Sequence, residues 1–145
     1  MSILGISFAF HLIGINLWVG ASFLLPLAII PALRRMTEDM QTAFLKTFVA
    51  RYLPLFVLGG ITVGITGWFQ TFDMLDDLNM TAAYIKHGAI VLLILVSAVE
   101  WLYLARRLAG APDNRPKVWQ WFVSMAWLQA ALGVIILFLT GWLTE

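Results

Sequence analysis

Two histidines are the residues of this chain whose type and position point most directly to chemistry. His11 lies in the apolar stretch "FAFHLIGINLWVGASFLLPLAIIPALRR", and His87 lies in "AAYIKHGAIVLLILVSAVEWLYLARRL". The sequence contains 2 histidines in all, and both lie in long apolar runs. An imidazole can ligate a metal, hold a hydrogen bond or carry a proton near neutral pH. Which of these it does depends on the elements that position the two rings.

Composition identifies those elements as membrane-embedded. Of the 145 residues, 61% are hydrophobic and only 12% are charged, and the mean hydropathy is +0.89. A bilayer explains this balance better than a soluble core does. The formal net charge of +1 gives no basic patch for a nucleic acid partner. The sequence contains no cysteine. This excludes disulfides, thiolate metal sites, iron–sulfur clusters and covalently attached haem.

Four apolar segments are each long enough to cross a bilayer, which takes roughly 20 helical residues. We expect helices at about 3–33, 48–72, 82–104 and 118–143. The polar joint "RRMTEDMQTAFLK" could form a short interfacial helix, "DMLDDLNMT" is acidic, and "RRLAGAPDNRPK" contains helix breakers. The first segment has the length of a retained helix rather than of a signal peptide. The prediction is an all-α, up-and-down four-helix transmembrane bundle that forms one domain over residues 1–145.

The distribution of charge predicts the orientation of this bundle. Basic residues flank the first and third joints, which should therefore face the cytoplasm, whereas the second joint is acidic. Both termini are then expected outside, in a protein of the bacterial inner membrane. Several tryptophans lie near segment ends, as in an aromatic belt. The basic residues are Arg34, Arg35, Lys46, Arg51, Arg106, Arg107, Arg115 and Lys117, the acidic ones are Asp73, Asp76 and Asp77, and the tryptophans are Trp18, Trp68, Trp101, Trp119, Trp121, Trp127 and Trp142.

In such a bundle the first and third helices run in the same direction. His11 and His87 each follow the outer start of their helix by a few residues, so a rise of ~1.5 Å per residue places both rings at a similar depth. Two imidazoles at matched depth are what a non-covalent haem b with two axial histidines requires. The iron ligands would be His11 and His87. A hydrogen-bonded or proton-relaying pair, and a site for another metal, remain alternatives.

Small and aromatic neighbours support a flat ligand beside the histidines. On the helix of His11, Gly14, Trp18 and Ser22 recur at helical spacing. A glycine strip on the second helix offers a smooth face for a macrocycle edge, or for ordinary helix packing. Lys86 could neutralise a haem propionate or extend to water. The predicted cofactor site comprises His11, His87, Gly14, Trp18, Gly60, Gly64, Gly67 and Lys86.

Three more polar residues lie inside the apolar segments: Asn16, Glu100 and Gln129. Glu100 is too far along its helix from His87 to contact the same haem directly. It could carry protons or contact a quinone. Alternatively, it could pair with Arg106 and Arg107 near the cytoplasmic interface.

With these residues identified, the chain resembles the small four-helix membrane proteins of the CopD and HemJ type. The resemblance is carried by "FHLIGINLWVGASFLLP", with His11, Gly14, Trp18 and Gly20, and by "YIKHGAIVLLILV". A HemJ-like protein implies haem b and oxidation of protoporphyrinogen, and a CopD-like protein implies copper uptake or resistance. His11 matches the first-helix histidine of the pattern, and Lys86 with His87 matches its third-helix polar site. The chain departs from the HemJ pattern because Lys86 directly precedes His87 and because Leu27 stands where an arginine is common.

Three classes of function follow. The first is a haem b electron-transfer protein or membrane oxidoreductase that works with a quinol, a porphyrin precursor or a redox partner in the membrane or at its outer face. The second is copper transport, although Cu(I) prefers thiolate or thioether ligands and the relevant methionines, Met36, Met40, Met74 and Met80, lie in the joints. The third is a structural or anchor subunit of a membrane complex. A homo-oligomer is compatible with each of them. Neither a hydrolytic constellation nor a nucleotide-binding glycine loop is apparent.

Overall fold

The computed structural model describes residues 3–73, 80–110 and 112–142, and within them the chain is helical and contains no strand. Four segments are long and apolar enough to cross a membrane: Gly5–Leu33, Glu38–Gln70, Ala83–Ala109 and Arg115–Thr140. The all-α transmembrane fold is therefore confirmed. The helices are α1 (Ile3–Leu24), α2 (Ile30–Leu33), α3 (Glu38–Asp73), α4 (Met80–Ala98), α5 (Arg106–Ala109) and α6 (Arg115–Trp142).

Two π-helical turns join consecutive helices into longer rods. Leu25–Ile29 connects α1 to α2, and Val99–Ala105 connects α4 to α5. The first turn contains Pro26, which lacks a backbone N–H and so interrupts the regular α-helical hydrogen bonds. The second contains Glu100 and no proline. Wide turns of this kind occur often at functional positions in helices.

Helix boundaries differ from the sequence prediction mainly around the first joint. α3 begins at Glu38 instead of near residue 48, so the polar segment expected as a separate interfacial helix forms the first turns of α3. Glu38 and Asp39 lie in that first turn, where their negative charge complements the positive end of the helix dipole. The rod that contains His87 also extends beyond residue 104, to Ala109. Most of the acidic joint, residues 74–79, lies outside the described residues.

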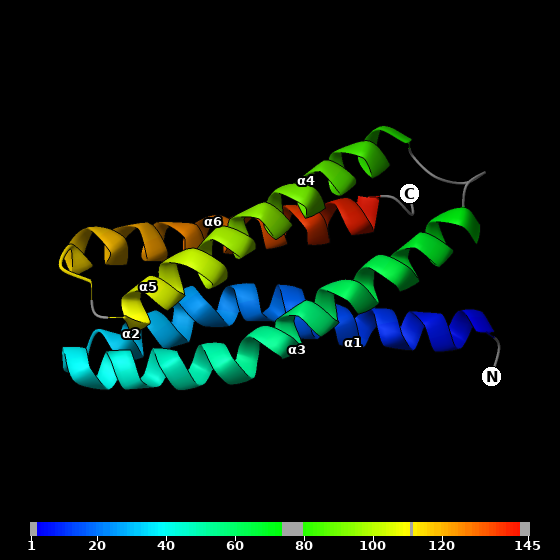
Figure 1. The fold of residues 1–145 in the computed structure, drawn as a ribbon. Coiled ribbons are helices and arrows are strands. Elements are labelled where there is room, and N and C mark those ends of the chain that lie inside the picture. The colour runs from blue at the N-terminus through cyan, green and yellow to red at the C-terminus, as the bar shows by residue number, and fades with distance from the viewer. Residues whose placement is uncertain (1–2, 74–79, 111, 143–145) are drawn as a thin grey trace.

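The helices pack as two pairs, α1 with α3 and α4 with α6, and α1 also contacts α6 (Figure 1). α1 begins and α6 ends at the same end of the bundle, which we call the terminal end. The opposite end, where α2 meets α3 and α5 meets α6, is the basic end. Toward the terminal end, α3 and α4 diverge in Figure 1. The core between the helices includes Trp18, Leu25, Leu33, Leu45, Leu93, Trp101, Leu108 and Phe122.

α1 and α3 approach each other most closely at two glycines. A Cβ atom on Gly14 would lie 2.8 Å from Val63 Cγ2 and 3.0 Å from the carbonyl oxygen of Gly59. A Cβ atom on Gly59 would lie 2.9 Å from Leu17 Cβ. These distances leave no room for a side chain at either position. Gly14 was expected to line the cofactor site, but the structure places it in this helix contact because α3 covers its face of α1.

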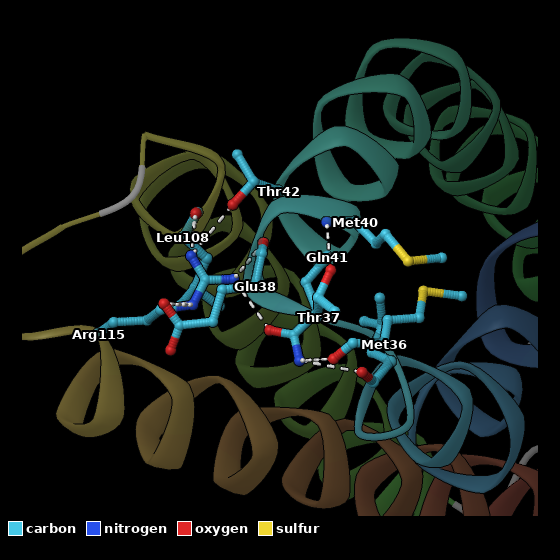
Figure 2. A network of polar contacts seen from close by, with 9 residues as sticks. Met36, Thr37, Glu38, Met40, Gln41, Thr42, Leu108 and Arg115 are labelled. Atoms are coloured by element: carbon cyan, nitrogen blue, oxygen red, sulfur yellow. Dashed lines mark hydrogen bonds and ion pairs between the residues drawn. The ribbon is translucent and has the colours of Figure 1, made fainter.

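A polar cluster around Arg115 holds the basic end together (Figure 2). The side chain of Arg115 is buried and donates hydrogen bonds to Gln41 Oε1 at 2.9 Å and to the Leu108 carbonyl at 3.1 Å. The Gln41 amide in turn donates to the Leu33 carbonyl at 3.0 Å. The Arg115 guanidinium also donates to the Thr42 hydroxyl and to the Glu38 carbonyl, and its Nε lies 4.0 Å from the Glu38 carboxylate. One side chain thus ties the start of α6 to α5 and α3.

The tryptophans are divided between the interior and the surface. Trp18 and Trp101 are buried in the core, where Trp101 packs edge-on against Phe122 with ring centroids 6.3 Å apart. Trp68, Trp121 and Trp127 are exposed. Trp68 and Trp121 lie near segment ends and can serve in the expected aromatic belt, whereas Trp127 lies midway along its segment. Trp18 and Trp101 are packing residues. The side chain of Trp142 lies outside the described residues.

Candidate cofactor site

A cavity toward the terminal end brings the two histidines together. His11 on α1 and His87 on α4 both line it, although α1 packs mainly on α3 and α4 on α6. Its empty volume is about 970 Å³ with the open side included. The residues of the predicted site that line this cavity are His11, Trp18, Gly60, Gly64, Gly67, Lys86 and His87.

The hydrogen bond of His11 determines which ring nitrogen carries the proton. His11 Nδ1 lies 2.8 Å from Thr66 Oγ1. The Thr66 hydroxyl already donates its only hydrogen to the Thr62 carbonyl, at 2.6 Å. Thr66 must therefore accept from the His11 ring, which places the proton on Nδ1. His11 Nε2 then carries the lone pair.

The His87 ring also carries a proton on Nδ1, but its acceptor is a backbone carbonyl rather than a hydroxyl. Its Nδ1 lies 2.7 Å from the carbonyl oxygen of Ala83, one turn earlier on α4. A carbonyl oxygen only accepts, so Nδ1 of His87 is also the protonated nitrogen. In the neutral form of each ring, Nε2 is then the unprotonated nitrogen. Metal-ligating histidines commonly have this form, since a hydrogen bond from the other nitrogen fixes the ring and raises its basicity.

The donor set of the cavity suits haem iron better than a bare metal ion. No group of three or more His, Cys, Asp or Glu side chains that could hold a metal ion occurs among the described residues. A structural or transported metal usually takes more protein ligands than two imidazoles. A porphyrin supplies its own four nitrogen ligands, so that two axial histidines complete the coordination. The two imidazoles are the ligand type that a haem b would use.

The glycine strip of α3 forms one wall of this cavity. Around a Cβ atom on Gly64 there would be nothing within 4 Å, so this position faces open space. A Cβ atom on Gly67 would lie 3.2 Å from His11 Cε1, which means that a larger residue there would push the imidazole. At Gly60 the nearest atoms belong to the Trp18 ring, at 3.8 Å. Gly60, Gly64 and Gly67 therefore line the cavity. The close contact between α3 and α1, which was the alternative role for this strip, is formed at Gly59 instead.

The lining of the cavity includes one cation and large apolar side chains. Lys86 lines the cavity beside His87 and is half-buried. Trp68 lines it as well and is 66% exposed. Lys86 is positioned to neutralise an acidic substituent of a cofactor in this cavity.

The other polar residues of the membrane segments lie elsewhere. Glu100 and Gln129 are buried deeper in the bundle, and the Gln129 amide donates a hydrogen bond to Glu100 Oε2. Ser22, expected on the face of His11, belongs to this group because its hydroxyl lies 3.4 Å from Gln129 Oε1. Asn16 is exposed on α1 and donates to the Leu12 carbonyl.

The structure contradicts the expected pairing of Glu100 with arginines. Arg107 donates to Tyr103 Oη at 2.5 Å and to Asn114 Oδ1 at 3.4 Å. Arg106 is exposed, whereas Glu100 is fully buried. The pairing fails because Glu100 faces α6 inside the bundle, while the arginines lie at its surface.

Sequence reasoning missed the residues that orient the imidazoles. Thr66 stands in the run "ITVGITG", and its hydroxyl is the partner of His11 across 55 positions of the chain. A threonine in an apolar helix usually bonds its own backbone, as Thr66 also does, so its type alone gives no sign of a second partner. The one available signal was its position beside Gly67, next to the strip already considered.

No protein-family model, curated protein or solved structure matches this chain.

Proposed function

We propose that the chain is a haem b protein of the membrane, in which His11 and His87 would hold the iron. The observation that carries this proposal is the shared protonation of the two rings in one cavity, with both Nδ1 atoms engaged as donors and both Nε2 atoms left to ligate. Both residues also line the same cavity, although they come from different helices. When bound, the haem supplies one-electron redox chemistry.

The chain's own residues have separate roles in this proposal. Thr66 and the Ala83 carbonyl hold the rings in one orientation. Gly64 faces open space, Gly67 has no side chain that would push the imidazole of His11, and Trp18 lines the cavity as well. Lys86 balances the charge of a propionate. The surrounding apolar side chains exclude water and lower the local dielectric, which is one of the means by which proteins adjust a haem potential.

A neighbouring groove favours a lipophilic electron donor. It lies between α3 and α4 and shares Trp18, Gly60 and Ile94 with the histidine cavity. Its other lining residues are apolar apart from Ser97, whose hydroxyl donates to the Leu93 carbonyl. A quinol, or an apolar porphyrin precursor, can approach such a groove from the lipid, whereas a charged soluble donor cannot. The proposed activity is therefore electron transfer or oxidation with a quinol-like or porphyrin-like reductant, passed on to a redox partner.

The basic end is proposed to face the cytoplasm of a bacterial cell. Exposed Arg34, Arg35, Lys46, Arg106 and Lys117 lie at this end, as the positive-inside rule requires of a cytoplasmic face. The histidine cavity then lies in the outer half of the inner membrane.

Copper transport receives less support from the contacts. Met36 is half-buried and Met40 is exposed, and both lie at the basic end, away from the histidine cavity. Cu(I) would therefore find no thioether beside the two imidazoles among the described residues. No specific observation favours this alternative.

The test is a pair of visible spectra, air-oxidised and dithionite-reduced, of the protein purified in mild detergent from haem-replete cells. The wild type should show a low-spin b-type spectrum. His11→Ala and His87→Ala should each lose the haem or convert it to a high-spin form. Asn16→Ala is the matched control, because Asn16 lies on α1 outside the cavity and bonds only its own helix. A colourless wild type, or variants with an unchanged spectrum, would refute the proposal.

A further inference from the structure

A second polar site lies in the interior of the bundle and does not take part in the proposed haem site. Glu100, Gln129 and Ser22 come from the π-helical turn after α4, from α6 and from α1, and all three side chains are buried. None of them lines the histidine cavity. Glu100 is 0% exposed and has no cationic partner in the described part of the chain, which is rare for a carboxyl group.

Polar contacts link Ser22 to Gln129 and Gln129 to Glu100. The Ser22 hydroxyl lies 3.4 Å from Gln129 Oε1 and 3.3 Å from the Trp18 carbonyl. The Gln129 amide donates to Glu100 Oε2, and this contact sets the orientation of the amide. One oxygen of Glu100 is thereby held as an acceptor. The other, Oε1, is buried and has no hydrogen-bond partner among the described residues.

Among the residues that the structure describes, the groups around Glu100 do not supply a positive charge. From α3, the titratable group is Tyr52, whose ring packs 5.3 Å from that of Trp101 and whose hydroxyl is buried without a described partner. α6 contributes Gln129 and α1 contributes Ser22, both neutral. The buried arginine of the bundle, Arg115, is engaged with Gln41 and Leu108 at the basic end.

An ionised carboxylate in these surroundings is strongly unfavourable. Moving a charge from water into an apolar interior costs far more than one amide hydrogen bond returns, so an unpaired buried acid takes up a proton. A neutral carboxylic acid also fits the observed bonds. Its carbonyl oxygen, Oε2, accepts from Gln129, and its hydroxyl is Oε1, the atom without a partner.

We propose that Glu100 is an intramembrane proton-binding site, in which Gln129 and Ser22 fix the carboxyl group and Oε1 holds an exchangeable proton. The ligand is the proton, and the site works as a proton store or relay in the membrane interior. Its position in a π-helical turn, which departs from regular helical bonding, is consistent with a functional role. The site does not depend on the presence of haem.

The test uses infrared spectroscopy and a carbodiimide label on the full-length protein in liposomes at neutral pH. A protonated buried acid gives a carbonyl stretching band above the amide region, and this band should shift in D₂O and be absent from Glu100→Gln. Dicyclohexylcarbodiimide adds to protonated carboxyl groups in apolar surroundings and should form one adduct, located on Glu100 by peptide mass spectrometry. Asp39→Asn is the matched control, since Asp39 is an exposed carboxylate and its loss should change neither readout.

Each alternative outcome is separable from the proposal. An absent band together with absent labelling would show an ionised Glu100 and overturn it. A band that does not respond to prolonged D₂O would show a proton that does not exchange, which also overturns it. Protection from labelling by sodium chloride but not by choline chloride would identify a cation site instead.

A second variant covers the case in which Glu100→Gln does not fold. Gln129→Leu keeps the acid and removes its donor, and so should move the carbonyl band to higher frequency. A band left in place would contradict the arrangement. The same measurements on His11→Ala should match the wild type. Failure of the haem proposal would therefore leave this one standing, and the reverse also holds.

Discussion

Replacing Gly14 by alanine tests the close approach of α1 and α3, on which the position of His11 depends. The new Cβ would lie 2.8 Å from Val63 Cγ2 and within 3.1 Å of two backbone atoms of α3. Contacts this short cannot be relieved by a side-chain rotation alone, because two of the three neighbours are backbone. The helices must separate by a few tenths of an ångström or more.

The magnitude follows from a comparison with Gly20 on the same helix. A Cβ on Gly20 would meet nothing within 4 Å. Both substitutions gain the same helix propensity, about 0.5–1 kcal/mol. Only Gly14→Ala adds overpacking, which costs about 1–3 kcal/mol. The difference in unfolding free energy between the two variants should therefore equal the steric cost, about 1–3 kcal/mol, with Gly14→Ala the less stable protein.

The assay is reversible unfolding in mixed micelles, titrated with a denaturing detergent and followed by tryptophan fluorescence and circular dichroism. Gly20→Ala should unfold at or above the wild-type midpoint, and Gly14→Ala should unfold below it. Equal midpoints for the two variants would refute the packing argument, since nothing but the approach of α3 distinguishes the two sites.

Two further predictions concern side chains that position other groups. Thr66→Val removes the acceptor of His11 Nδ1 and should weaken haem affinity roughly 10–100-fold in a haemin titration of the apoprotein. The control is Thr62→Val, because the Thr62 hydroxyl donates to the Leu58 carbonyl of its own helix; this variant should keep the wild-type affinity. Equal affinities would show that Thr66 does not orient the ring. Arg115→Met should lower the unfolding free energy by roughly 1.5–3 kcal/mol for each charge-assisted bond lost, whereas the exposed Lys117→Met should stay within about 0.5 kcal/mol of wild type. A small effect of Arg115→Met would mean that the basic end does not need this cluster.

The proposed haem site and the proposed Glu100 proton site lie in different parts of the bundle. The cavity lies toward the terminal end and opens to the surroundings, and the buried acid lies deeper, toward the basic end. Trp18 connects them, because its ring lines the cavity and its carbonyl is within reach of Ser22. A membrane redox protein that releases or takes up protons would need both kinds of site. The spectra and the carbodiimide label test each one independently.

The sequence by itself determined the number and approximate extent of the membrane segments. A long apolar run in lipid must form a helix, because every backbone N–H and C=O group then has to find its hydrogen-bond partner within the segment. The shared depth of His11 and His87 also followed from the sequence, because helical rise and alternating direction are fixed by geometry. Their shared cavity in the structure agrees with that reasoning.

Only the tertiary structure decided which faces of the helices meet. In a soluble protein, an apolar stripe marks the buried face of a helix, but these helices are apolar on nearly all sides, so periodicity gives no such information. The assignment of Gly14 to a helix contact, the choice of Thr66 as partner of His11 and the pairing of Glu100 with Gln129 all depend on the rotation of one helix against another. That rotation is set by contacts between residues far apart in the chain, which a single sequence does not record.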